Sequence, residues 1–396
     1  MKTSYVIWHD NDYDLALWVY NNSDLKQKEY VKLKAIPKSN DEGIIAADFT
    51  ENSDYFILPY IKFATPDILI QKIENDRSKI LFATEFMTQT PQHDHVFQRF
   101  ERIYCISNEK VPVAFVFPQT KAKLERGSRK DYVQVLYHPN PLAVHVYLKT
   151  TQINKNPTLM FFWPDSKGYL KLDPYHPTAP MKEGQVVGWI KFLNLCLEEK
   201  NVEDLLKDEI IKSQIDFLES NYLFGKEKFY TVSFENYIEH LKDNYSLSRV
   251  NIMTTKDAID KFKLDKSKLS KEFLKTPKAV IFSYKSQKFR TDPYCGFVCG
   301  FKNLFCLNAE GKRKLNLIHV PSGIKYTDIS GKDVFKEYKE DVIKCPLFNN
   351  FNFNKFKLND IKRHLKEGCI YTLSKQQRIF ATVSDVVVFE DKNYFN

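Results

Sequence analysis

Two carboxylic acids, each close to an end of a short apolar segment, are the residues best suited to metal chemistry. Asp67 follows Pro66, and after seventeen further residues Glu85 lies near the end of the apolar segment 79–87. We expect 67–73 and 79–87 to be neighbouring strands, so that both carboxylates meet at one edge of a sheet. Carboxylate oxygens are the ligands that Mg²⁺ prefers. A bound cation would activate a water molecule and stabilise charge on a phosphate under attack.

An ionised side chain inside an apolar strand needs compensation, because burying an unpaired carboxylate is costly. For Asp67 or Glu85 taken alone, a helix cap or a salt bridge would be a sufficient reason. The presence of both acids in this order of strands favours a shared cation instead.

The elements around this pair are expected to be strand, turn, strand, helix and strand. Residues 75–78 read as a polar turn, and Asp94 can cap a helix over 95–103. The apolar run 111–117 then predicts a third buried strand. This order predicts a mixed α/β core in which a central sheet is flanked by helices.

The rest of the chain predicts more strands and helices and a division into domains. A length of 396 residues is typical of two domains, or of three. We assign 1–200 to a first domain, 201–245 to a helical linker, and 246–396 to a second mixed α/β domain. Further strands are expected at 4–8, 16–20, 132–137, 142–148, 158–163, 279–284, 295–307 and 315–320, and further helices at 186–199, 202–224 and within 256–274.

Composition narrows the class of partner. The 59 Lys and Arg against 50 Asp and Glu give a formal charge of +9, which suggests a polyanion. The chain has only 12 Gly and no Gly-rich phosphate loop, so no small-molecule cofactor is expected. Seven cysteines without a C-x-x-C favour a reducing, cytoplasmic location. No apolar run is long enough for a signal peptide or a membrane span.

The segment Thr65-Pro-Asp-Ile-Leu-Ile, together with the strand that ends in Thr-Glu-Phe-Met87, resembles the core of the PD-(D/E)xK nucleases. That superfamily includes many type II restriction endonucleases. The resemblance covers roughly residues 40–120, a range that includes the helix and the strand expected after Met87. It implies a restriction-endonuclease-like core, Mg²⁺ as cofactor with Asp67 and Glu85 as its ligands, and double-stranded DNA as substrate.

The chain departs from that family at one position. The family usually has Lys two residues after the second acid, where this chain has Met87. A thioether cannot replace an ammonium group, so we expect Gln89, Gln98 or Arg99 to supply part of its function. The alternative for three residues of the next helix is a solvated surface: Gln98, Arg99 and Arg102. His93 and His95 lie in the loop beside the expected site, where they could bind metal or act as a base.

Basic residues in three groups are candidates for contacts with nucleic acid. The residues that we select for this role are Lys121, Lys123, Arg126, Arg129, Lys130, Lys288 and Arg290. Another group lies between Lys130 and Lys288: Lys261, Lys263, Lys266, Lys268, Lys271 and Lys275. The alternative is a solvated surface in a lysine-rich protein.

These observations predict a metal-dependent DNA endonuclease, with the sequence specificity of a type II restriction enzyme. Restriction enzymes that cut both strands often dimerise, so a homodimer is expected as well. One alternative is a non-catalytic DNA-binding or assembly protein on a degenerate nuclease fold, which Met87 favours. Another is an RNA-processing or host-defence nuclease of the same fold. The second domain would either recognise DNA or mediate dimerisation.

Overall fold

The computed structural model divides the chain into two compact units. Unit 1 contains Met1–Ile36 and Thr65–Tyr230, and unit 2 contains Pro37–Ala64 and Thr231–Asn396. The linker and domain boundaries assigned above stay predictions. The structure describes residues 3–36, 54–61, 63–87, 97–119, 121–125, 132–136, 141–164, 184–223, 249–285, 291–322, 379, 382–389 and 394–395.

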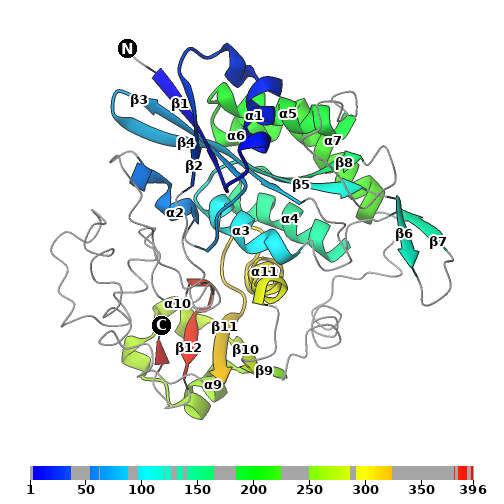
Figure 1. The fold of residues 1–396 in the computed structure, drawn as a ribbon. Coiled ribbons are helices and arrows are strands. Elements are labelled where there is room, and N and C mark those ends of the chain that lie inside the picture. Colours follow the sequence, from blue (N-terminus) through cyan, green and yellow to red (C-terminus); the bar gives the residue numbers. More distant parts are fainter. Residues whose placement is uncertain are drawn as a thin grey trace. The chain divides into compact units, whose positions relative to one another are not determined.

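A mixed sheet forms the centre of unit 1 (Figure 1). Within the described residues its six strands follow the order β2-β1-β3-β4-β5-β8. The pairs β1–β3 and β3–β4 are antiparallel, whereas β1–β2, β4–β5 and β5–β8 are parallel. The strands are β1 (Thr3–His9), β2 (Val31–Ala35), β3 (Ile68–Glu74), β4 (Arg77–Phe86), β5 (Val113–Gln119) and β8 (Thr158–Pro164).

The register of these strands places the two acids at one edge of the sheet. Ile68 pairs with His9 of β1 on one side and with Thr84 of β4 on the other. Asp67 therefore precedes β3 at the level where Glu85 approaches the end of β4. The predicted strands around 67–73, 79–87 and 111–117 are confirmed, with shifts of a few residues at their ends.

Helices cover both faces of this sheet (Figure 1). On one face, Trp189 of α5 donates a hydrogen bond from Nε1 to Oγ1 of Thr84 at 3.1 Å. On the opposite face, the ring of Tyr147 of α4 stacks on Phe115 of β5 at 5.7 Å between centroids. The helices on the same face as Trp189 are α1 (Tyr13–Asn22), α5 (Gly184–Leu197), α6 (Val202–Lys207) and α7 (Glu209–Leu218). Those on the opposite face are α3 (Phe100–Asn108) and α4 (Pro141–Asn154).

Two strands predicted in unit 1 are helices in the structure. Residues 16–20 belong to α1, whose N-cap Asp12 accepts a hydrogen bond from the backbone N–H of Leu15. Residues 142–148 belong to α4, which begins at Pro141, a favourable first residue of a helix. Both predictions were wrong because these helices are rich in apolar residues, and an apolar run looks alike in a buried strand and a buried helix.

The remaining elements of unit 1 are short. The helix predicted over 202–224 is interrupted at Asp208, which caps α7 by accepting a hydrogen bond from the backbone N–H of Ile210. Leu205 and Ile211, on either side of this break, pack into the core of unit 1. The short elements are a 3₁₀ turn (Asp24–Gln27), a 3₁₀ turn (Phe97–Arg99), the hairpin β6 (Lys121–Glu125) and β7 (Tyr132–Leu136), and a π-helical turn (Glu219–Leu223).

A second mixed sheet organises unit 2, so the predicted α/β class with two sheets is confirmed. Its described strands follow the order β13-β12-β11-β10-β9. The residues 295–307, predicted as a strand, instead form α11 and a π-helical turn, again in a nearly continuous buried apolar run. The elements are a 3₁₀ turn (Asp54–Ile57), α2 (Leu58–Ile61), β9 (Arg249–Thr254), α9 (Thr255–Phe262), a 3₁₀ turn (Lys266–Lys268), α10 (Lys271–Lys275), β10 (Lys278–Lys285), α11 (Thr291–Phe301), the π-helical turn (Lys302–Cys306), β11 (Asn316–Ser322), β12 (Val386–Val388) and β13 (Tyr394–Phe395).

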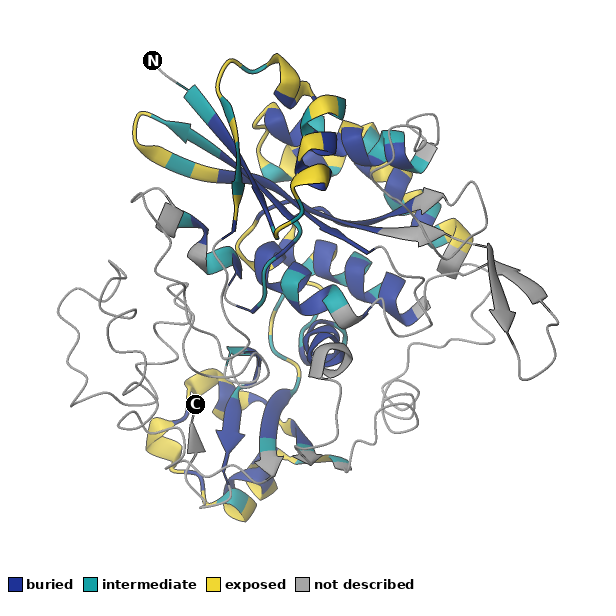
Figure 2. Cartoon of the chain, in the orientation of Figure 1, coloured by how far each residue is buried: buried dark blue, intermediate teal, exposed yellow. Residues whose placement is uncertain are grey.

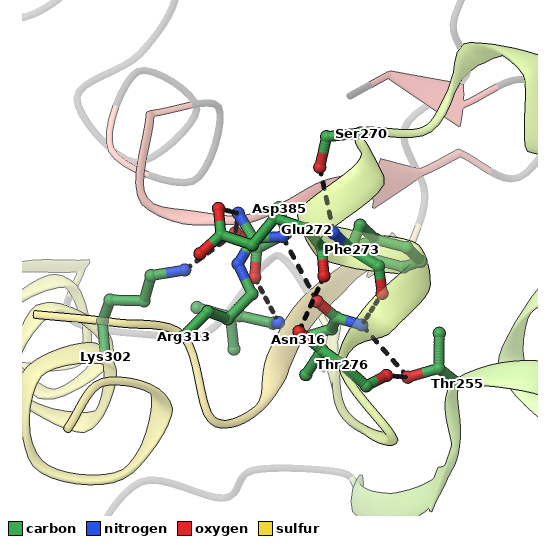
Figure 3. Close-up of polar contacts among 10 residues, drawn as sticks. Thr255, Ser270, Glu272, Phe273, Thr276, Lys302, Arg313, Asn316 and Asp385 are labelled. Atoms are coloured by element: carbon green, nitrogen blue, oxygen red, sulfur yellow. Dashed lines mark hydrogen bonds and ion pairs between the residues drawn. The ribbon is translucent and has the colours of Figure 1, made fainter.

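Asp385 links three segments of unit 2 (Figure 3). Its Oδ1 accepts from Lys302 Nζ at 2.9 Å and lies 3.0 Å from Arg313 Nη2, while Oδ2 accepts from the backbone N–H of Leu317 at 2.7 Å. Such a buried charge is stable only because its partners are complete. Within the described residues, no helix in either unit is long and apolar enough to cross a membrane.

We predict that a buried histidine makes unit 2 sensitive to acid. His319 lies in β11, and burial lowers its pKa from 6.5 to about 3. Between these two values the unfolded chain binds more protons than the folded chain, so stability falls as the pH drops below 6.5. At pH 5 this one group should cost about 2 kcal/mol relative to neutral pH.

The substitution His319→Leu removes the titrating group, and urea unfolding at pH 7 and pH 5 checks its effect. The difference in unfolding free energy between the two pH values should shrink by about 2 kcal/mol in the variant. An unchanged difference would mean that His319 is not buried as a neutral imidazole.

Candidate functional site

Glu85 is a carboxylate enclosed inside unit 1 and held by two arginines. Its side chain is fully buried, and Oε1 accepts hydrogen bonds from Nη1 of Arg99 at 3.0 Å and Nη1 of Arg102 at 2.8 Å. Hydrogen bonds between ionised partners are stronger than neutral ones. The two guanidinium groups therefore compensate for burying Glu85, which explains how an acid is tolerated inside an apolar strand.

Asp67 lies beside Glu85 at the same sheet edge. Its Oδ2 accepts a hydrogen bond from the backbone N–H of Phe86 at 2.5 Å, which ties the start of β3 to the end of β4. Burial raises the pKa of Asp67 to about 8, with the charge of Glu85 as the second cause. Near neutral pH, and without a cation, the raised pKa therefore favours the protonated form of Asp67.

The positive charge at the site comes from the helix that follows β4. Arg99 ends the 3₁₀ turn and Arg102 lies in the first turn of α3, so a spacing of three residues puts both on the side that faces Glu85. Their exposure differs, since the side chain of Arg99 is 31% exposed and that of Arg102 is 13% exposed. Met87, where the family has Lys, is buried and carries no charge.

Polar atoms without a hydrogen-bond partner among the described residues gather on this side of the sheet. They include Oε2 of Glu85, Nε of Arg102 and the hydroxyl of Tyr147. Tyr147 is fully buried, and burial raises its pKa well above the usual value, with the charges of Glu85 and Glu101 adding to the rise. Buried polar atoms in this state commonly bind water or an ion.

The donors present fit a hard divalent cation with two protein ligands. Oε2 of Glu85 is buried and is not used by either arginine, and Asp67 adds a second carboxylate whose ionisation a cation would favour. Mg²⁺ is often held by one or two carboxylates, with water and substrate oxygens as its other ligands. Within the described part of the chain, three or more His, Cys, Asp or Glu side chains do not gather in a group that could hold a metal.

The structure brings together some of the predicted site residues and leaves others outside its description. Asp67, Glu85 and Arg99 lie together at the sheet edge. Gln98 belongs to the 3₁₀ turn, and Lys121 and Lys123 to β6, but their side chains are not described. The residues outside the described ranges are Gln89, His93, His95, Arg126, Arg129, Lys130, Lys288 and Arg290.

Sequence reasoning missed one residue of the site, Tyr147, and left the role of Arg102 open. For Arg99 and Arg102, the sequence allowed either a place in the site or a solvated helix face. In the structure both contact Glu85, so the solvated alternative is wrong for both. The signal was available, because arginines three residues apart at the start of a helix must face one side. Tyr147 gave no such signal, since its segment was predicted to be a strand.

We predict that the two arginines contribute unequally to stability although they contact the same oxygen atom. Removing the more buried partner leaves Glu85 poorly compensated, so Arg102→Met should lower the free energy of unfolding by about 3–5 kcal/mol. Arg99→Met is the matched control, and its cost should stay below about 1 kcal/mol because its guanidinium is partly solvated. Urea denaturation measures both values, and equal losses would contradict this division.

No protein-family model matches this chain, and neither does a curated protein or a solved structure. The function must therefore be inferred from the chemistry of the site alone.

Proposed function

We propose that the chain is a Mg²⁺-dependent endonuclease that hydrolyses the phosphodiester bonds of double-stranded DNA, with the sequence specificity of a type II restriction enzyme. The observation that carries this proposal is the pair Asp67 and Glu85 at one sheet edge, beside two arginines. Acidic residues that attract a cation, next to donors that can bind a phosphate, are the groups that phosphodiester hydrolysis needs.

The order of the surrounding elements supports the proposal. The antiparallel pair β3–β4 is followed by α3 and then by β5, which is parallel to β4. This is the strand, turn, strand, helix and strand order on which the resemblance to the PD-(D/E)xK core was based. The register of β3 and β4 is what brings Asp67 and Glu85 to the same level.

We infer different roles for the residues of the site. Asp67 and Glu85 would hold Mg²⁺, which when bound supplies charge stabilisation at the phosphate and an activated water. Arg102, the more buried of the two arginines, would keep Glu85 ionised and oriented. Arg99, the more exposed, would contact the phosphate with its free N–H groups and so replace the Lys that is absent at Met87.

One observation favours the rival, a non-catalytic DNA-binding or assembly protein on a degenerate nuclease fold. Both arginines bind the same oxygen of Glu85, and that side chain is fully buried. Such a triad can serve stability alone. The rival and the enzyme differ in one respect that can be measured, namely whether the protein has an activity that depends on these acids.

The first experiment is to incubate the purified protein with unmethylated phage DNA, with Mg²⁺ or with EDTA, and to separate the products on a gel. We expect discrete bands that require Mg²⁺. Asp67→Asn and Glu85→Gln should each lower the cleavage rate by about 100-fold or more, because they remove charge that binds the cation.

Asp76→Asn is the matched control for this experiment. Asp76 is an exposed acid in the turn of the same hairpin, at a positive φ of 62° that Asn adopts readily. The Asp76→Asn variant should cleave DNA at the same rate as the unchanged protein. A gel shift of the DNA without any Mg²⁺-dependent cleavage would reject the nuclease in favour of the non-catalytic binding protein. A smear in place of discrete bands would show a nuclease without sequence specificity.

The nature of the substrate is tested by comparing duplex DNA, single-stranded DNA and RNA of the same sequence. We expect cleavage of duplex DNA to be at least about tenfold faster than that of the other two, since a site built for both strands positions only a duplex correctly. Faster cleavage of RNA would favour the RNA-processing or host-defence nuclease.

A further inference from the structure

Unit 2 carries a surface of exposed lysines that the site in unit 1 does not use. Residues 255–275, which run from α9 to α10, contain seven lysines against four acidic residues. We call this segment the lysine layer. Its lysines, all exposed, are Lys256, Lys261, Lys263, Lys266, Lys268, Lys271 and Lys275.

The packing of the lysine layer gives it one outward side. Its apolar side chains pack with those of β10, β11 and β12 into one core, and these are Ala258, Ile259, Leu264, Leu269 and Phe273. Because these residues face the sheet, the lysines between them face the solvent. Figure 2 shows the same contrast, with exposed segments along these helices and buried strands beside them.

The lysines of this surface outnumber its acids by three, and few of these lysines form ion pairs. Among the described residues, Lys268 is the one lysine of the layer in an ion pair, at 3.9 Å from Asp265. The acid Glu272 is instead engaged by Arg313 at 3.5 Å (Figure 3). Lys256 lies in the first turn of α9, where the helix dipole disfavours a cation, so local stability does not account for its charge.

The chemistry of the lysine layer selects among the possible polyanions. Residues 255–275 contain no Arg, Asn or Gln, which are the usual readers of base edges. Phe273 is buried and Phe262 is partly buried, so the layer lacks an exposed aromatic platform for single strands. Apart from Leu274, which is 41% exposed, the large apolar side chains of both helices pack against the core, so little apolar surface is left to insert into a membrane.

We propose that the lysine layer of unit 2 binds the phosphate backbone of duplex DNA without reading its sequence. The choice of DNA rests on the proposed function, whereas the surface itself is defined by the packing and charge of unit 2. Lysines that replace condensed counterions contribute to affinity through the release of those ions. The affinity should therefore depend steeply on salt, and more so than on DNA sequence.

Fluorescence anisotropy with a labelled duplex, in EDTA and over a series of NaCl concentrations, tests this proposal. The variant Lys256→Gln, Lys266→Gln, Lys271→Gln, Lys275→Gln removes four exposed charges from the full chain. The slope of log K against log [NaCl] should become shallower by about 2–4, since each lost phosphate contact removes about 0.9. Affinity near 0.1 M NaCl should fall by at least about tenfold.

A second variant removes four exposed lysines from unit 1 as a matched control: Lys26→Gln, Lys191→Gln, Lys207→Gln and Lys212→Gln. Its salt slope should change by less than about 1, although the net charge falls equally. Unchanged binding by the first variant, or an equal loss by the control, would overturn the proposal. Equal lysine-dependent binding to phosphatidylserine vesicles or to duplex RNA would also overturn it, by showing that the surface does not select DNA.

Binding and cleavage fail separately in this design. EDTA prevents any Mg²⁺-dependent cleavage, so the anisotropy experiment measures binding alone. If the protein never cuts DNA but the salt slope of the unit 2 lysine variant is shallower than that of the unchanged protein, the binding surface stands and the nuclease is rejected. If cleavage occurs but the salt slope of the unit 2 lysine variant equals that of the unchanged protein, the nuclease stands and DNA binding by the lysine layer is rejected.

Discussion

The enclosure of one carboxylate sets the conditions for unit 1. Glu85 is fully buried near the end of β4, and a buried charge is tolerated only with well-placed partners. Those partners come from the segment that starts α3, which must therefore run against this face of the sheet. The crossover from β4 through α3 to the parallel strand β5 is thus fixed at its beginning by an ion pair as well as by apolar packing.

The same carboxylate adds to the effect of burial on the pKa of its neighbour, Asp67. Asp67 is tied to β4 by the backbone N–H of Phe86, so it cannot move away from the charge of Glu85. Burial raises the pKa of Asp67 to about 8, and the charge of Glu85 adds to this rise. A bound cation would favour the ionised form of Asp67, so the proposed Mg²⁺ would offset a cost that the pair carries in the metal-free fold.

The strands that carry the site could be predicted from sequence, and Arg99 was among the candidates for its positive charge, whereas the sequence left open whether Arg102 faces the site. Short apolar runs on either side of a polar turn fix β3 and β4, and their register then follows. The helices α1, α4 and α11 were mistaken for strands because their apolar runs lack a clear polar face. Met87 left a charge unaccounted for, and Arg99 and Arg102 supply positive charge beside Glu85 from the start of α3, whose packing against this face of the sheet depends on contacts across space.

Electrostatics in the two units act over different distances. The pair of Glu85 and Arg102 is buried and in direct contact, so mobile ions screen it little. The lysine layer is exposed, so the attraction that we propose between it and a phosphate backbone would fall steeply as salt is added. Salt therefore separates the two contributions: a concentration that weakens capture by unit 2 should leave the ionisation and stability of the site in unit 1 nearly unchanged. A nuclease of this kind would lose affinity for DNA before it lost the ability to cleave bound DNA.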